Sequence, residues 1–144
     1  TQTMFAMVED LAYLVYEIGR IQTKAKEVIT MGGKPAKQAQ KTWDALEALR
    51  TDLVVTTGDN YVASAEPELR ERMGELYSNI ATSYDRVDGS LKSNFELISE
   101  EFTTEKTRFV KIMDKDVKKF YKALEKNDLE LPVVKTKEVF LAKD

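Results

Sequence analysis

A regular hydrophobic period near the N-terminus constrains the fold of this chain more than any other feature. Between Met4 and Val28, apolar side chains recur at alternating steps of three and four residues. The stripe consists of Met4, Met7, Leu11, Leu14, Ile18, Ile21, Ala25 and Val28. A period of about 3.5 residues held over several heptads is typical of a helix that packs lengthwise against other helices. Additional apolar residues widen the stripe, so this helix is expected to face two neighbours. They are Phe5, Val8, Val15 and Ile29.

Turn and capping residues divide the 144-residue chain into four helices that form one domain. We expect these helices at about residues 3–31, 35–56, 66–87 and 90–126. Two glycines and a proline in Met31–Pro35 favour a left-handed helix end. Ser90 is a suitable N-cap for the last helix. Four amphipathic helices with short connections predict an all-α fold, an antiparallel four-helix bundle. The alternating polarity of Val133–Asp144 predicts a short extended C-terminal arm after it.

Each of the later helices also carries an apolar stripe at helical spacing. The second helix has Ala36, Ala39, Trp43, Leu46, Leu49 and Leu53, and the third has Leu69, Met73, Leu76, Ile80 and Tyr84. The fourth has Leu91, Phe95, Ile98, Phe102, Phe109, Val117, Phe120 and Leu124. Between Phe109 and Val117 one alternative stays open, because either Ile112 or Met113 fits the spacing. Trp43, the only tryptophan, is expected to pack in the core.

The composition excludes several kinds of catalytic and metal site. The chain has no histidine, which rules out Ser-His-Asp triads, histidine-ligated zinc or haem, and the Glu-x-x-His di-iron sites of helical bundles. It has no cysteine, so disulfides, thiol nucleophiles and iron–sulfur clusters are excluded as well. We therefore expect no enzyme activity, no metal and no other cofactor in this chain.

The charge and hydropathy of the chain also limit its partners. A net charge of −3 and a pI near 5.2 give no general electrostatic reason to bind nucleic acid or an anionic membrane. No apolar run approaches the roughly 18 residues that a membrane-spanning helix needs. The end of the fourth helix is basic, with Lys111, Lys115, Lys118, Lys119, Lys122 and Lys126. These lysines lack the interleaved aromatic side chains of a nucleic-acid patch, so we interpret them as a solvated face.

The segment Ala81–Phe95 is rich in aspartate, serine and asparagine, which raises the question of a calcium site. An EF-hand loop needs a glycine at its sixth position and oxygen ligands around it. With Gly89 at that position, the ligand positions fall on Tyr84, Arg86, Asp88 and Phe95. Only Asp88 carries a suitable side chain, so the calcium motif fails. Asp88-Gly89-Ser90 instead predicts a turn that leads into a helix N-cap.

Acidic residues cluster in the fourth helix, and we interpret them as a solvated face that complements the helix dipole. They are Glu100, Glu101, Glu105, Asp114 and Asp116. Neighbouring acids on a helix diverge in direction, so they do not form the facing carboxylate pair of a glycosidase. Two tyrosines are better candidates for a binding surface, because exposed aromatic rings are common partner contacts. They are Tyr61, in the long loop, and Tyr84, near the end of the third helix.

From Trp43 onward, the helices carry an ordered set of aromatic, aliphatic and acidic positions. These are Leu76, Tyr77, Ile80, Tyr84, Asp85, Phe95, Phe102, Asp116, Phe120 and Leu124. Their order resembles the C-terminal helical region of large secreted bacterial proteins that carry a sortilin-like or BNR-repeat β-propeller and are often labelled glycosyl-hydrolase-like. Two positions depart from that pattern. Asp88-Gly89-Ser90 replaces a Pro-Thr pair, and Phe120-Tyr121 replaces a Phe-Asn pair.

The resemblance implies a fragment of a longer extracytoplasmic protein, periplasmic or secreted, whose catalytic or sugar-binding residues would lie in the propeller. Our leading hypothesis is a non-catalytic structural or interaction module, with the propeller in cis or another protein as its partner. The alternative hypothesis is an extracytoplasmic sensor-type four-helix bundle that binds a small ligand in a polar-lined pocket between the first and fourth helices. The wide apolar stripe of the first helix also leaves homo-oligomerisation open.

Overall fold

The computed structural model describes residues 4–54, 68–81 and 89–142, and these residues form helices and connecting segments without any strand. The helices are α1 (Met4–Met31), α2 (Lys34–Leu53), α3 (Leu69–Ala81), α4 (Gly89–Ile112), α5 (Lys118–Lys126) and α6 (Lys137–Ala142), with a π-helical turn η1 (Met113–Val117) between α4 and α5. The structure therefore confirms the predicted all-α helical bundle.

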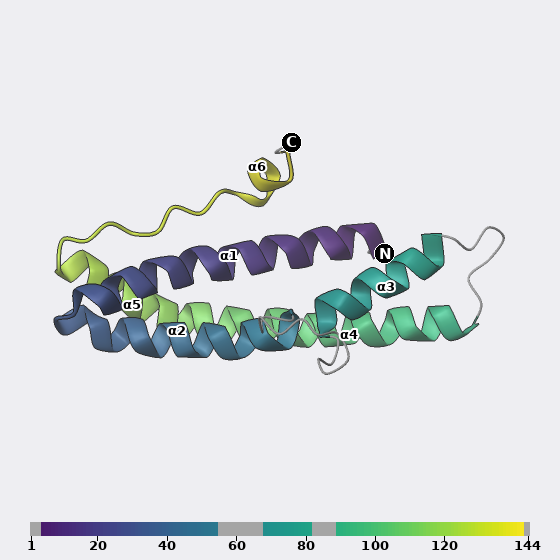
Figure 1. Ribbon diagram of the computed structural model, residues 1–144, viewed down its shortest axis with the longest axis horizontal. Coiled ribbons are helices and arrows are strands. Elements are labelled where there is room, and N and C mark those ends of the chain that lie inside the picture. The colour runs from purple at the N-terminus through teal and green to yellow at the C-terminus, as the bar shows by residue number, and fades with distance from the viewer. Residues whose placement is uncertain (1–3, 55–67, 82–88, 143–144) are drawn as a thin grey trace.

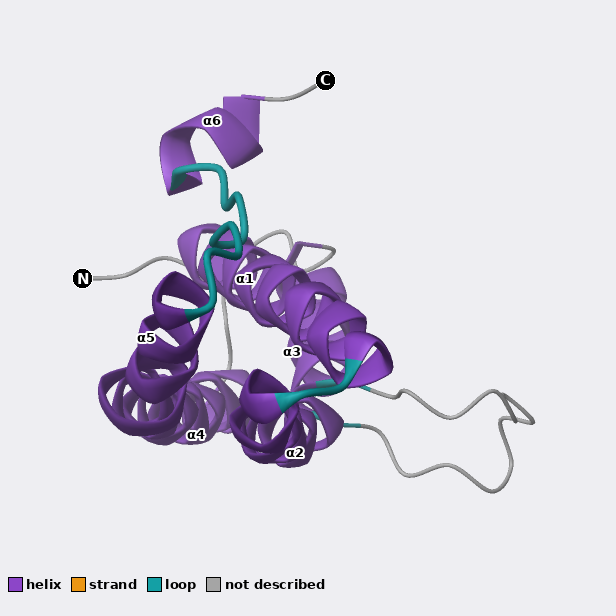
Figure 2. Ribbon diagram, turned by 90° about the vertical axis from the view of Figure 1, so that its left-hand side faces the viewer, coloured by secondary structure: helices purple, strands orange, loops and turns teal. Residues whose placement is uncertain are grey.

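The helices form an elongated bundle in which α1 lies along both α2 and α3 (Figure 1). The chain reverses direction after α1, so α2 runs antiparallel to it. The segments α4, η1 and α5 make one continuous rod along the bundle. Helix α2 packs against the C-terminal half of this rod, and α3 packs against its N-terminal half. Seen along the bundle, α1, α2 and the rod occupy the corners of a triangle (Figure 2). Helices α2 and α3 thus follow one another along the same rod.

The core agrees closely with the apolar stripe predicted for the first helix. All eight stripe residues between Met4 and Val28 are buried in α1. Three of the flanking residues, Val8, Val15 and Ile29, are partly buried against the core, whereas Phe5 is exposed. The other buried apolar residues come from every long helix. They include Ala39, Leu46, Leu49 and Leu53 of α2, Leu69, Met73 and Leu76 of α3, and Ile98, Phe102 and Phe109 of α4.

The helix ends agree with the sequence predictions over most of the described chain. Gly32 and Gly33 have φ angles of 74° and 88°, which places both in the left-handed region between α1 and α2. Helix α2 ends at Leu53 rather than residue 56, because Val54 adopts an extended backbone. Helix α3 begins at Leu69 rather than residue 66, and its predicted end lies outside the described residues. The fourth predicted helix is present as the whole rod.

The single π-helical turn lets the rod keep its apolar side chains on one side. Ile112 and Val117 are both buried, although they are five residues apart. At about 3.6 residues per α-helical turn, a step of five would rotate Val117 away from the core. The wider π turn takes up the additional residue. Ile112 is therefore the buried member of the stripe, and Met113 lies partly buried beside it.

The π turn also presents a backbone carbonyl to α2. The carbonyl oxygen of Asp116 accepts hydrogen bonds from Thr42 Oγ1 at 3.0 Å and from Gln38 Nε2 at 3.2 Å. Gln38 Nε2 also donates to Thr42 Oγ1 at 3.2 Å. Because Thr42 is fully buried, its hydroxyl needs a partner within the protein. These bonds tie α2 to the rod where regular α-helical bonding is interrupted.

The C-terminal arm differs from the extended segment that the sequence predicts. Residues 129–136 have no regular secondary structure, but Lys137–Ala142 form the short helix α6. Thr136 caps this helix, because the Val139 amide donates a hydrogen bond to Thr136 Oγ1 at 3.3 Å. Glu138 supplies an acid in the first turn. The prediction was wrong for α6 because these capping signals outweigh the alternating polarity.

Replacing Thr42 by valine should lower the free energy of unfolding by about 1–2 kcal/mol, because it removes a buried hydrogen bond but keeps the side-chain shape. Thr51 on the same helix offers a matched control, since its hydroxyl donates to the Ala48 carbonyl one turn earlier. Thr51→Val should change the free energy by less than about 0.5 kcal/mol. Urea unfolding followed by circular dichroism measures both variants. Equal effects would show that the bond to Asp116 does not stabilise the bundle.

Candidate functional site

The two tyrosines predicted as partner contacts, Tyr61 and Tyr84, lie outside the residues that the structure describes. Asp85 and Asp88 also lie outside those residues, so the part of the predicted turn at Asp88 stays a prediction. The predicted N-cap at Ser90 was wrong, because α4 already begins at Gly89 and Ser90 lies inside the helix. Candidate sites therefore come from the surfaces of the described helices.

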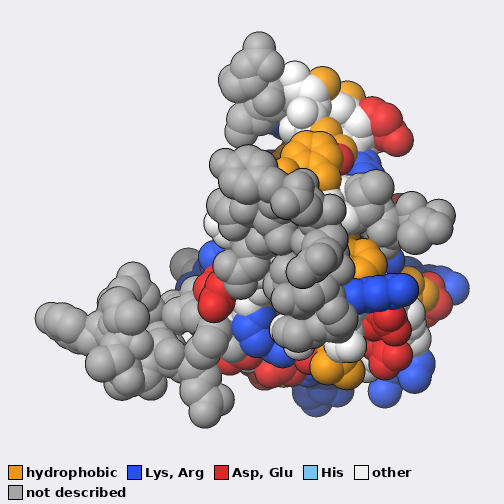
Figure 3. Space-filling view, turned by 90° about the vertical axis from the view of Figure 1, so that its right-hand side faces the viewer, with side chains coloured by type: hydrophobic (Ala, Val, Ile, Leu, Met, Phe, Trp, Pro, Cys, Tyr) orange, Lys and Arg blue, Asp and Glu red, His pale blue; other side chains and the backbone are white. Residues whose placement is uncertain are grey.

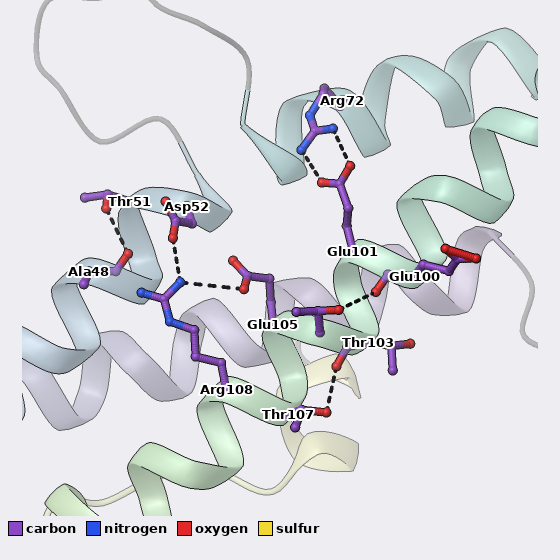
Figure 4. A network of polar contacts seen from close by, with 11 residues as sticks. Ala48, Thr51, Asp52, Arg72, Glu100, Glu101, Thr103, Glu105, Thr107 and Arg108 are labelled. Atoms are coloured by element: carbon purple, nitrogen blue, oxygen red, sulfur yellow. Dashed lines mark hydrogen bonds and ion pairs between the residues drawn. The ribbon is translucent and has the colours of Figure 1, made fainter.

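Arginine–carboxylate pairs connect α2 and α3 to the middle of α4 (Figure 4). Arg72 on α3 donates to both carboxylate oxygens of Glu101, at 2.9 and 2.6 Å. Arg108 on α4 donates to Asp52, at the end of α2, at 2.6 Å. The same guanidinium lies 3.7 Å from Glu105. Two members of the predicted acidic face, Glu101 and Glu105, therefore take part in ion pairs that the sequence did not predict.

The sequence carries a signal for part of this network. Glu105 and Arg108 are three residues apart on one helix, which is a favourable spacing for an ion pair. The pairs that join different helices have no such local signal. Glu100 and Asp114 are exposed, as the predicted solvated face requires.

The two paired glutamates have pKa values shifted in opposite directions. Hydrogen bonds from Arg72 lower the pKa of Glu101, and partial burial opposes this effect. Burial raises the pKa of Glu105, because its attraction to Arg108 does not fully compensate for lost hydration. Carboxylates with separated pKa values also occur in enzyme sites. Here Glu101 pairs with Arg72 of another helix, whereas Glu105 lies beside Arg108 of its own helix.

The described surface carries charged side chains of both signs. Within residues 4–54, 68–81 and 89–142, no group of three or more acidic side chains is placed to hold a metal ion. At one end of the bundle, Lys or Arg side chains lie next to Asp or Glu side chains wherever described residues are visible (Figure 3). No helix of that part is long and apolar enough to cross a membrane.

The C-terminal arm is held on the outer face of α1 by backbone and side-chain contacts. Tyr13 donates its hydroxyl hydrogen to the Lys135 carbonyl at 2.7 Å, and the Lys135 amide donates to the Tyr16 hydroxyl at 3.0 Å. Arg20 Nε donates to the Val133 carbonyl at 3.1 Å. The Phe140 ring stacks on Tyr16 with 4.8 Å between centroids. These contacts attach the arm to α1.

An ion pair completes the attachment of the arm. Lys137 Nζ donates to the carboxylate of Asp10, and this hydrogen bond raises the pKa of Lys137. Among the described helices, α6 packs against α1. Its side chains are all partly or fully exposed, and Val139 is 55 % exposed. Val133, in the segment before α6, is 73 % exposed. The arm therefore presents apolar side chains to the outside of the bundle.

A polar-lined groove of about 440 Å³ lies between α1 and α2. Its lining residues are Gly19, Gln22, Thr23 and Lys26 of α1 with Trp43 and Arg50 of α2. Gln22 is buried and donates to the Trp43 carbonyl at 3.3 Å and to Glu47 Oε1 at 3.1 Å. Lys26 Nζ lies 6.0 Å from the centroid of the Trp43 ring. The polar-lined space that the structure describes here is thus between the first and second helices, not the first and fourth.

The position of Trp43 differs in part from its predicted place in the core. Its side chain is only partly buried, and it packs against the core while also lining the groove. The sequence gives a hint of this position. On the helix, Ala39 and Leu46 lie on one flank of Trp43, whereas the polar residues Gln40 and Glu47 lie on the other, so Trp43 is at the edge of the apolar stripe.

No protein-family model matches this chain, and neither a curated protein nor a solved structure matches it. The resemblance to propeller-associated helical regions therefore stays a prediction.

The contribution of the Arg72–Glu101 pair should depend on pH. The folded-state pKa of Glu101 is lower than the usual value of 4.5. The stabilisation is therefore fully present above about pH 5 and is lost as the pH falls through the folded-state pKa. Both side chains are partly exposed, so screening limits the contribution to about 0.2–1 kcal/mol. Urea unfolding should show Glu101→Gln less stable than the unmodified protein at pH 7, with the difference vanishing near pH 2.

Glu100→Gln is the matched control, because Glu100 is the exposed neighbour of Glu101. It should show almost no stability difference at either pH. A Glu101→Gln effect that stays constant between the two pH values would contradict a role for the ionised carboxylate.

Replacing Phe140 by alanine should release the arm without unfolding the bundle, because the ring stacks on Tyr16 while α6 contributes no buried residue. Loss of an aromatic contact of about 0.5–1.5 kcal/mol should speed trypsin cleavage after Lys135 or Lys137 roughly 2- to 10-fold. Val139→Ala, on the same short helix, is the control and should leave the cleavage rate unchanged. Mass spectrometry of timed digests measures the rate. Equal rates for both variants would mean that the stack does not hold the arm.

Proposed function

We propose that this chain is a non-catalytic structural and interaction module of a secreted protein that carries a β-propeller ahead of it. The observation that carries the structural role is a continuous apolar core from α1 through the rod, with polar side chains used to tie helices together. A long helical rod of this kind can hold attached partners at a fixed separation. The secreted context and the propeller rest on the sequence resemblance.

The interaction role is supported by the C-terminal arm. The arm crosses the outer face of α1 and exposes Val133 and Val139, which are costly to leave in water. A partner could cover these side chains without disturbing the core, because α6 has no buried residue. The partner in this proposal is the propeller of the parent protein in cis, or another protein.

The proposal predicts three results for the chain and its parent protein. The purified chain should give no turnover of glycans or peptides when present at substoichiometric concentration, because the absence of histidine and cysteine removes the usual nucleophile–base pairs. The gene region upstream should encode β-propeller repeats, and the separately expressed propeller should co-elute with this chain in size-exclusion chromatography. Steady turnover by the chain alone would overturn the non-catalytic role. An upstream region without a propeller would overturn the proposed context.

The groove between α1 and α2 favours a second candidate function, an extracytoplasmic sensor-type bundle that binds a small ligand. Its volume of about 440 Å³ lies within the usual range for small-molecule sites. Homo-oligomerisation through α1 has less support, because α2, α3 and the rod all pack against this helix and the arm covers part of its outer face.

A further inference from the structure

Gly19 is an unusual residue to find in the middle of α1. Glycine in a helix interior costs about 1 kcal/mol relative to alanine, because it loses more backbone entropy on folding. Such a cost is often explained by close packing, but a Cβ atom added at Gly19 would meet no atom within 4 Å. Nothing inside the described chain requires a glycine at this position. Its missing side chain instead leaves open space in the wall of the groove between α1 and α2.

The antiparallel arrangement of α1 and α2 gives this groove two distinct ends. Lys26 lies over Trp43 at one end, and seven residues separate Trp43 from Arg50 on α2. Two helical turns correspond to about 10 Å. Gly19 is seven residues before Lys26 on α1, so it lies toward the Arg50 end. An aromatic face and a guanidinium are thus separated by about the length of a small organic molecule.

The groove also has an electrostatic preference. Its lining contains the cations Lys26 and Arg50 and no carboxylate. Glu47 lies beside the groove, where its Oε1 accepts from Gln22 at 3.1 Å and lies 3.6 Å from Arg50. The Gln22 amide hydrogens are thus occupied, and the exposed guanidinium of Arg50 keeps further donors for an anion. The local charge is positive although the whole chain carries −3.

We propose that this groove binds a small organic anion in which a phosphate or carboxylate is attached to a flat ring. The ring lies against the indole of Trp43, and the anionic group binds Arg50 next to the space left by Gly19. Lys26 adds positive charge at the ring end, and the Thr23 hydroxyl, which donates to the Gly19 carbonyl at 2.8 Å, keeps acceptor capacity for a ligand hydroxyl. This inference deepens the second candidate function and does not depend on the structural role.

Trp43 allows a direct test, because it is the only tryptophan and it lines the groove. Adenosine monophosphate and benzoate are the probes for the two sources of the anion, a phosphate and a carboxylate. At least one should change the fluorescence in a saturable way with a Kd below about 1 mM. Adenosine has the ring without the anionic group, and inorganic phosphate has the anionic group without the ring. If adenosine monophosphate is the better probe, each of these two should bind at least about tenfold more weakly than adenosine monophosphate. Benzyl alcohol is the corresponding neutral control for benzoate.

Two variants locate the binding in the groove. Arg50→Gln should weaken binding of the better probe about tenfold or more, because it removes the charged donors. Gly19→Leu should also abolish or strongly weaken binding, because its side chain fills the groove. Gly74→Leu is the matched control: Gly74 is also a helical glycine with no atom within 4 Å of an added Cβ, and it is not part of the groove lining. Circular dichroism melting of all three variants distinguishes lost binding from lost folding.

The outcomes separate this inference from the structural proposal. Binding of a ring-bearing anion that Arg50→Gln and Gly19→Leu weaken, and Gly74→Leu preserves, supports the groove as a ligand site. No fluorescence change with either probe up to about 10 mM would overturn it, as would a change that is the same in the folded Arg50→Gln and Gly19→Leu variants. Neither negative result would affect the structural role, which needs no ligand.

Discussion

The enclosed apolar stripe of α1 is the constraint on which the rest of the structure depends. This helix has 28 residues, whereas α2 has 20 and α3 has 13, so neither of these shorter helices covers it alone. Placed one after the other along the rod, they cover it together. The rod must then present apolar side chains over the whole length of the bundle. Because Ile112 and Val117 are five residues apart, an unbroken α-helix would not keep both in the core. The π turn follows from this requirement, and α2 uses the carbonyl of Asp116 that it presents.

The sequence predicts those features of the fold that depend on the spacing of residues within one helix. The eight buried positions of α1 follow from one period, because a regular helix fixes the direction of each side chain. The same reasoning left Ile112 and Met113 open, since the position of a π turn depends on its neighbours in the bundle as well as on its own residues. The arm shows the same limit at its C-terminal end. Six residues are too few for periodicity to distinguish a strand from a short helix, and the cap at Thr136 and the stack of Phe140 on Tyr16 favour the helix.

The candidate sites were harder to predict because their residues come from different helices. Arg72 and Glu101 are 29 positions apart, and Asp52 and Arg108 are 56 apart, so no spacing rule connects them. The spacing of Trp43 predicts a place on the core stripe. This describes only one side of the ring, which packs against the core. Its other contacts come from α1, where Gln22 and Lys26 lie beside it. A glycine in mid-helix is visible in the sequence, but only the structure distinguishes one that packs closely from one that faces open space.

Helix α1 has three faces with different roles, and their separation has a functional consequence. One face carries the buried stripe, a second carries Tyr13, Tyr16 and Arg20 under the arm, and a third carries the side chains of the groove. Only the first face is needed to hold the bundle together. The arm and the groove can therefore be occupied independently, because they lie on different faces of α1. Yet both lie on the same helix, so a partner on the arm and a ligand in the groove would be neighbours on α1. Such a bundle can serve as a structural rod and still carry a binding site, because the buried stripe and the groove lie on different faces of α1.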